Sequence, residues 1–132
     1  MAVLLAAAML VGQTFTNGID QTPFDPGDTP TPGSEEVEVP LSPYAYLYAT
    51  YPKLARRMDC VISRESKWNP GAVNSKSGAA GLAQFLLSTW LTTPQGASGA
   101  SRYDPYANID GAAWLATHSG WFHWTVVLYG YC

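Results

Sequence analysis

One carboxylate and several neutral polar side chains stand close together between residues 60 and 85. Glu65 is the only acid in this stretch, and it follows an apolar run. Gly78 and Gly81 would allow the backbone to approach a ligand closely. Because apolar surroundings raise the pKa of a carboxyl group, we expect Glu65 to act as a general acid. Neutral side chains that would hydrogen-bond a polar substrate without neutralising this acid are Ser66, Asn74, Ser77 and Gln84.

The position of Glu65 depends on the helix that carries it. This helix is predicted to begin near Thr50, as its cap, and to continue to Glu65. A solvated glutamate at a helix end is the alternative interpretation, since burying an unpaired carboxylate is costly. At about 100° per residue, Glu65 shares one face of the helix with four apolar residues. These residues are Leu54, Met58, Val61 and Ile62.

The rest of residues 42–132 predicts a mainly α domain. No internal repeat and no alternating strand pattern is present. Asn108 or Asp110 is expected to cap the helix that contains them. The expected elements after Glu65 are a loop at 74–84, a short helix at 84–93, an exposed loop at 94–106, a helix at 108–120 and another at 121–130.

The first 41 residues differ in character from this domain. Residues 1–16 contain an apolar stretch of signal-sequence length, so we expect no stable membrane span in the mature protein. Residues 17–41 are rich in proline, glycine, threonine and acids, which predicts a disordered linker. Residues 1–41 carry six acids and no base, whereas residues 42–132 carry seven bases and four acids. The mild positive charge of residues 42–132 is compatible with binding to an anionic polymer and equally with an ordinary solvated surface. The basic residues are too sparse to predict nucleic-acid binding.

The two cysteines favour a disulfide over a metal site. Cys60 and Cys132 form the only possible pair, and one pair in a small exported domain is typically oxidised. No C-x-x-C motif is present, and His118 and His123 do not complete a set of zinc ligands. We therefore expect a Cys60–Cys132 bond and no metal.

Two contiguous motifs resemble a known family. ESKWNPGAVN at 65–74 and SGAAGLAQFLLSTW at 77–90 are similar to motifs of the transglycosylase SLT family of lysozyme-like, peptidoglycan-cleaving enzymes. SRYDPYANIDGAAWLA at 101–116 resembles a further segment of that family. The resemblance covers about residues 51–130 and implies a lysozyme-like α-helical domain with a substrate groove.

The resemblance also implies roles for single residues. Glu65 takes the place of the family's catalytic acid and base, with Ser66 beside it. Gln84 takes the place of the groove glutamine, and Tyr129 matches the tyrosine of the family's third motif, A-Y-N. Two positions depart from the family pattern, Ala83 where methionine is common and Gly130 where the third motif has asparagine.

The implied reaction is cleavage of the β-1,4 bond between N-acetylmuramic acid and N-acetylglucosamine in peptidoglycan glycan strands. Glu65 alone would act as acid and then as base while a 1,6-anhydro ring closes, so that neither a second carboxylate nor a cofactor is needed. The alternatives are a lysozyme-type muramidase, with Asp104 or Asp110 as the second acid, and an inactive wall-binding module. A protein of any of these kinds is expected to be monomeric and secreted or extracytoplasmic, encoded by a bacterium or a phage.

Overall fold

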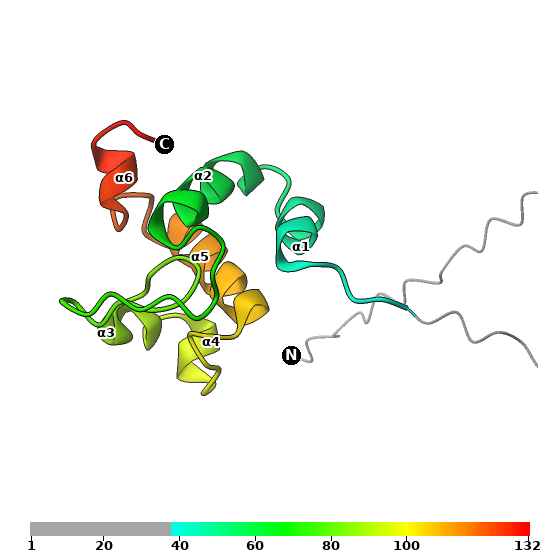
Figure 1. Cartoon of the computed structure of the whole chain (residues 1–132), viewed down its shortest axis with the longest axis horizontal. Helices are drawn as coiled ribbons and strands as arrows, with labels where there is room; N and C mark the ends of the chain where they lie inside the picture. The colour runs from blue at the N-terminus through cyan, green and yellow to red at the C-terminus, as the bar shows by residue number, and fades with distance from the viewer. Residues whose placement is uncertain (1–37) are drawn as a thin grey trace, which may run out of the picture. The chain divides into compact units, whose positions relative to one another are not determined.

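A computed structural model of the protein describes residues 38–132 (Figure 1). The apolar segment at 1–16 and the linker up to residue 37 lie outside the described residues. Six α-helices and two isolated antiparallel β-bridges make up the described part. The prediction of a mainly α fold is therefore confirmed. The helices are α1 Pro43–Thr50, α2 Ala55–Glu65, α3 Leu87–Trp90, α4 Pro94–Ala97, α5 Pro105–His118 and α6 Thr125–Leu128.

The first helix, α1, was not expected from the sequence. Ser42 caps it by accepting a hydrogen bond from the backbone of Ala45, and Pro43 occupies the first turn. Thr50 is therefore the last residue of α1, and its predicted role as the cap of α2 is wrong. The chain leaves the helical conformation at Tyr51 because the following proline disfavours it there.

The core is built around α5, which packs against α1 and α4, while α2 packs against α1 and α6. The predicted apolar stripe on α2 is confirmed, since Met58, Val61 and Ile62 have no exposed surface. Trp90 lies against α5 at Gly111, where a Cβ atom would come within 2.7 Å of the indole ring. A residue without a side chain is thus required for this close contact.

Helix α5 starts earlier than predicted. Asp104 is its N-cap and accepts hydrogen bonds from the backbone N–H groups of Tyr106 and Ala107, each at 2.9 Å. Pro105 follows in the first turn. Neither Asn108 nor Asp110 is the cap, because both lie within the helix. The expected loop at 94–106 also contains α4, and the helix expected at 121–130 is limited to α6.

Candidate active site

Glu65 is the last residue of α2 and is half-buried at the end of the apolar stripe. Burial raises the pKa of its carboxyl group, and no charge or hydrogen bond contributes to the shift. The protonated form is therefore favoured relative to a fully hydrated glutamate. A carboxyl group in this state can donate a proton to a bound substrate, as general acid catalysis requires.

The three other acids of residues 42–132 are held by hydrogen bonds. Asp59 accepts from the hydroxyl of Tyr48 at 2.8 Å and from the indole of Trp68 at 3.0 Å. Asp104 caps α5. Asp110 accepts from two tyrosine hydroxyl groups. Each of these carboxylates has a structural partner that holds it as an acceptor, which leaves Glu65 as the candidate acid of the domain.

Gln84 is held in a strained conformation at the turn that follows Gly81. Its φ of 53° lies in the left-handed region, which is uncommon for a residue with a side chain. Its amide nitrogen donates to the carbonyl oxygens of Ala72 at 3.1 Å and Gly81 at 2.9 Å. Both amide hydrogens are thus used, and the amide oxygen is the group that remains for a ligand. Strain of this kind is concentrated at functional sites.

The loop between Glu65 and Gln84 connects the two residues through Ala72. Ser66 caps α2, and its hydroxyl donates back to Ile62 at 3.2 Å, so it fixes the helix end. Lys67 and Trp68 then adopt left-handed backbone conformations, with φ of 52° and 61°, which reverse the chain. The chain reaches Ala72, which accepts from Gln84. Ser66, the residue after Glu65, therefore holds the end of α2 in position in this structure.

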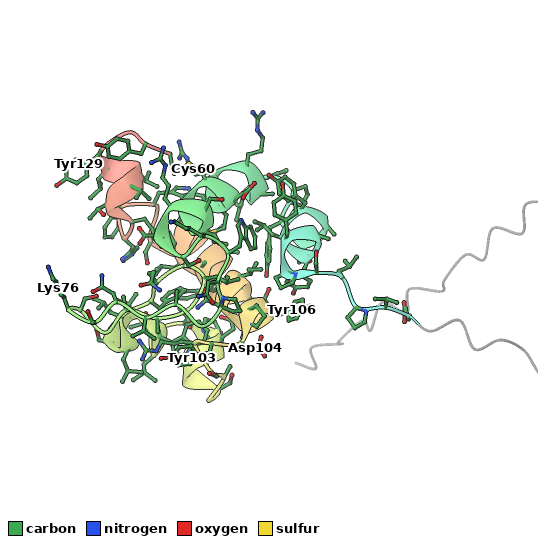
Figure 2. All side chains as sticks on the ribbon, in the orientation of Figure 1. Cys60, Lys76, Tyr103, Asp104, Tyr106 and Tyr129 are labelled. Atoms are coloured by element: carbon green, nitrogen blue, oxygen red, sulfur yellow. A yellow bond between two sulfur atoms is a disulfide. The ribbon has the colours of Figure 1, made fainter. Side chains whose placement is uncertain are left out.

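Asn74 and Ser77 form the exposed turn of this loop. The side-chain oxygen of Asn74 accepts from the backbone of Lys76 at 2.9 Å and of Ser77 at 3.2 Å. The hydroxyl oxygen of Ser77 accepts from the backbone of Ala79 at 3.2 Å. The Asn74 amide nitrogen and the Ser77 hydroxyl hydrogen remain as donors for a ligand. Figure 2 shows Lys76 at the outer end of this loop.

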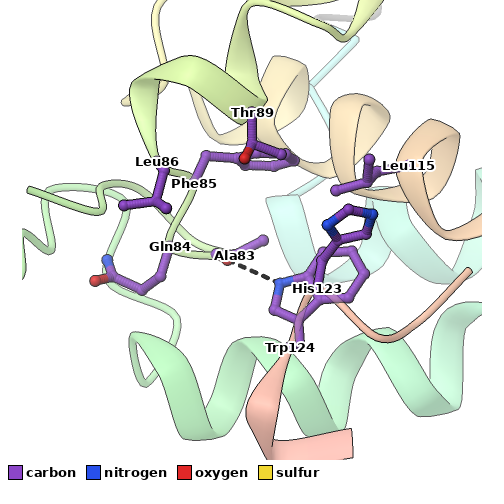
Figure 3. A pocket seen from close by; sticks show the side chains of 8 residues that line it. All are labelled: Ala83, Gln84, Phe85, Leu86, Thr89, Leu115, His123 and Trp124. Atoms are coloured by element: carbon purple, nitrogen blue, oxygen red, sulfur yellow. Dashed lines mark hydrogen bonds between the residues drawn. The ribbon is translucent and has the colours of Figure 1, made fainter. Parts of the chain in front are cut away.

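A pocket of about 140 Å³ lies beside Gln84 (Figure 3). His123 and Trp124 form one wall, and the Trp124 indole donates to the carbonyl oxygen of Ala83 at 2.9 Å. Burial lowers the pKa of His123, which favours its neutral form. Of the residues predicted to form the site, Gln84 lines this pocket and Glu65 does not.

A family model of the transglycosylase SLT domain matches residues 49–131 of the chain. The chain belongs to this family. No curated protein and no solved structure matches the chain. In residues 38–132, no helix is long and apolar enough to cross a membrane.

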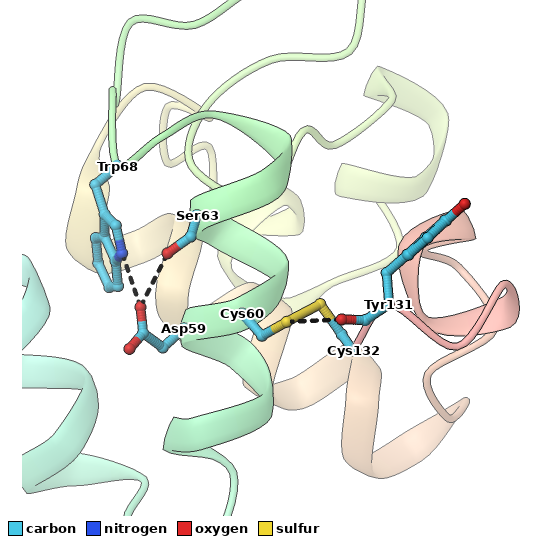
Figure 4. The surroundings of a disulfide bond; sticks show 6 residues. All are labelled: Asp59, Cys60, Ser63, Trp68, Tyr131 and Cys132. Atoms are coloured by element: carbon cyan, nitrogen blue, oxygen red, sulfur yellow. Dashed lines mark hydrogen bonds between the residues drawn. A yellow bond between two sulfur atoms is a disulfide. The ribbon is translucent and has the colours of Figure 1, made fainter.

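The C-terminal segment of the SLT domain is fastened to α2 by the predicted disulfide (Figure 4). Cys60 and Cys132 are bonded, with Cα atoms 5.7 Å apart. The Cys60 sulfur lies 3.3 Å from the carbonyl oxygen of Tyr131. This is a contact and not a hydrogen bond, because an oxidised cysteine has no S–H group to donate. The prediction of a Cys60–Cys132 bond is confirmed.

Tyr129 lies on this segment and points away from the domain. It follows α6, and 75% of its surface is exposed (Figure 2). Gly130 has a φ of 75°, and a Cβ atom at this position would meet no neighbouring atom. Asparagine tolerates left-handed backbone better than most residues do. Glycine at position 130 therefore suits the left-handed turn that follows Tyr129.

Arg102 and Asn108 support the site, and neither was predicted to do so. Asn108 is fully buried, accepts from the backbone of Ala83 at 2.9 Å and donates to the carbonyl oxygen of Arg102 at 2.8 Å. The Arg102 guanidinium donates to the carbonyl oxygens of Phe85 at 2.8 Å and Gly78 at 3.0 Å. Asn108 thus binds the residue before Gln84 to α5, and Arg102 binds the residue after it. The available signal was an asparagine between the apolar residues Ala107 and Ile109.

Among residues 38–132, no three histidine, cysteine or carboxylate side chains lie close enough to hold a metal ion. His118 stacks on Trp114, with ring centroids 4.4 Å apart. His123 lies beside Phe122, at a centroid distance of 4.1 Å. Both histidines are thus engaged with aromatic neighbours.

Proposed function

We propose that this SLT domain is a peptidoglycan lytic transglycosylase in which Glu65 is the single acid and base. The observation that carries this proposal is the contrast among the four acids of residues 42–132. Asp59, Asp104 and Asp110 are engaged in hydrogen bonds, whereas burial alone raises the pKa of Glu65. A hydrolase of the usual kind needs a second free carboxylate near the acid. The engagement of the other three acids in hydrogen bonds supports a reaction that uses a single carboxylate.

The reaction begins with proton transfer from Glu65 to the glycosidic oxygen between N-acetylmuramic acid and N-acetylglucosamine. The bond to the muramyl C1 then breaks, and the acetamido group of the same sugar stabilises the positive charge on C1. The ionised Glu65 next takes the proton of the muramyl 6-hydroxyl, whose oxygen bonds to C1. This step closes the 1,6-anhydro ring and returns Glu65 to its protonated state, so no water is consumed.

Gln84 and the loop around it are proposed to bind the glycan strand. The Gln84 amide oxygen is a suitable acceptor for a sugar hydroxyl or acetamido N–H group. Ser77 and Asn74 offer donors from the exposed turn, and Tyr129 offers an exposed ring face, a surface on which sugars can stack. The buried position of Ser66 favours a supporting role for it.

The disulfide supports a place of action outside the cytoplasm. Bonds of this kind persist in oxidising compartments and are rare in the cytosol. Peptidoglycan strands, which are the substrate in this proposal, also lie outside the cytoplasm. We therefore propose that the protein is exported and acts on the cell wall.

Mass analysis of digested peptidoglycan tests this proposal. Wild-type protein should release products that end in 1,6-anhydromuramic acid, one water lighter than hydrolytic products. Glu65→Gln should bind wall sacculi but lose at least about 100-fold in turnover, because the amide cannot supply the proton. Reducing-end muramic acid as the main product would indicate a muramidase. Binding to sacculi without any released product from the wild-type protein would indicate a binding module.

A further inference from the structure

Residues 53–67 carry most of the positive charge of the domain. They hold five of the seven bases of residues 42–132 but only two of its four acids. All five bases are exposed to solvent. They are Lys53, Arg56, Arg57, Arg64 and Lys67. The net positive charge of the domain is therefore concentrated along α2 and at its two ends.

The three arginines form a row on α2 that faces away from the buried apolar stripe. At 100° per residue, Arg56, Arg57 and Arg64 lie within about 100° of one another around the helix. From Arg56 to Arg64 the row extends about 12 Å along the helix axis. This length exceeds the reach of one small anion. It matches a linear polymer that carries a charge on successive repeats.

Aromatic side chains near the C-terminus hold two of these arginines in place. The Arg57 guanidinium lies over the Trp121 ring, 5.4 Å from its centroid, and the Arg64 guanidinium lies over the Tyr131 ring at 5.2 Å. The disulfide fastens this segment to α2 beside them. A guanidinium group over a ring still presents the N–H groups at its edge, so it can bind a phosphate through two hydrogen bonds. Because the rings already restrain these side chains, less conformational freedom is lost on binding.

The acids near this arginine row do not neutralise it. Asp59 accepts hydrogen bonds from neutral side chains, among them Ser63 and Trp68, and Figure 4 shows these three residues on another side of α2 from the disulfide. No charge contributes to the pKa shift of Glu65. If the main-chain carboxylate of Cys132 is counted as a third acid, the five bases still outnumber the acids of this region. The row therefore keeps a positive potential.

We propose that the arginine row binds a linear polyol-phosphate polymer of the cell wall. Such a polymer has a phosphodiester on each repeat, so several phosphates can meet the three arginines at once. The carboxylates of peptidoglycan lie on separate stem peptides and match a continuous row less well. The disulfide favours an oxidising compartment, which argues against nucleic acid. In addition, arginines already cover one face of Trp121 and of Tyr131, where bases would otherwise stack.

Fluorescence anisotropy of labelled poly(glycerol phosphate), titrated with the full chain, tests the arginine row. The affinity of wild type should fall as the salt concentration rises, because binding releases counterions. Replacing Arg56, Arg57 and Arg64 together by glutamine should weaken binding about tenfold or more at low salt, since each exposed charge pair contributes up to about fivefold. The slope of log Kd against log salt concentration should fall by about 2. Circular dichroism should show unchanged helix content, because all three side chains are exposed.

Lys76→Gln is the matched control, because it removes one exposed charge from the outer end of another loop (Figure 2). Arg64→Gln should weaken binding about threefold, and Lys76→Gln should leave it unchanged. Equal effects of these two variants, or unchanged binding by the triple variant, would overturn the site. Polyglutamate and oligothymidylate of equal charge should bind more weakly than poly(glycerol phosphate), and equal or tighter binding of either would overturn the identification of the ligand. Glu65→Gln should bind the polymer with unchanged affinity, which separates this test from that of the proposed function.

Discussion

Replacement of Asn108 by alanine should destabilise the domain and reduce activity, although this residue does not face the Gln84 pocket. The Asn108 side chain is fully buried and bridges the backbone of Ala83 and Arg102. Its loss would leave the Ala83 N–H group and the Arg102 carbonyl oxygen without these partners. Each unsatisfied buried group costs about 1–3 kcal/mol, so the loss of both partners should lower the free energy of unfolding by about 2–6 kcal/mol.

Urea unfolding measures this loss, and Asn69→Ala is the matched control. Asn69 is exposed and makes one local hydrogen bond, to the backbone of Gly71 at 2.9 Å. Its replacement should cost less than about 1 kcal/mol. Turnover of soluble glycan fragments by Asn108→Ala, measured well below its melting temperature, should also fall because Gln84 loses its support. Equal destabilisation by the two variants would refute the proposed bridging role.

Three further predictions concern stability. Gly81→Ala should lower the melting temperature far more than Gly99→Ala, as measured by thermal melts of both variants. Both glycines have positive φ, but only a Cβ atom at Gly81 would collide with Arg102 and Asn108. Replacing Cys60 and Cys132 by alanine should cost about 4 kcal/mol on the chain-entropy model, as measured by denaturant unfolding. Because burial raises the folded-state pKa of Glu65, wild type should lose stability relative to Glu65→Gln as pH rises from about 4 to 7. A stability difference between the two proteins that stays constant across that pH range would contradict the burial of Glu65.

The stripe on α2 shows what can be predicted locally. Met58, Val61 and Ile62 are buried as their spacing indicates, and Glu65 follows on the same face. Helix boundaries were predicted less well. Asp104 caps α5, where Asn108 or Asp110 was expected, because the Asp104–Pro105 pair falls within the loop expected at 94–106. A D-P pair suits both a turn and a helix start, so local sequence alone did not distinguish them.

The amino-acid sequence by itself determined the helical class, the SLT family motifs, the cysteine pair and the choice of Glu65 as the candidate acid. These features depend on short-range periodicity and on residue types, which are visible without coordinates. Only the tertiary structure decided which carboxylates are already engaged, because the partners of Asp110 come from α1 and the chain after it. It also decided that Asn108 supports the Gln84 turn from a distant helix, and that Arg57 and Arg64 lie over aromatic rings near the C-terminus. Hydrogen bonds between residues far apart in sequence depend on how the helices pack, and no local pattern specifies that packing.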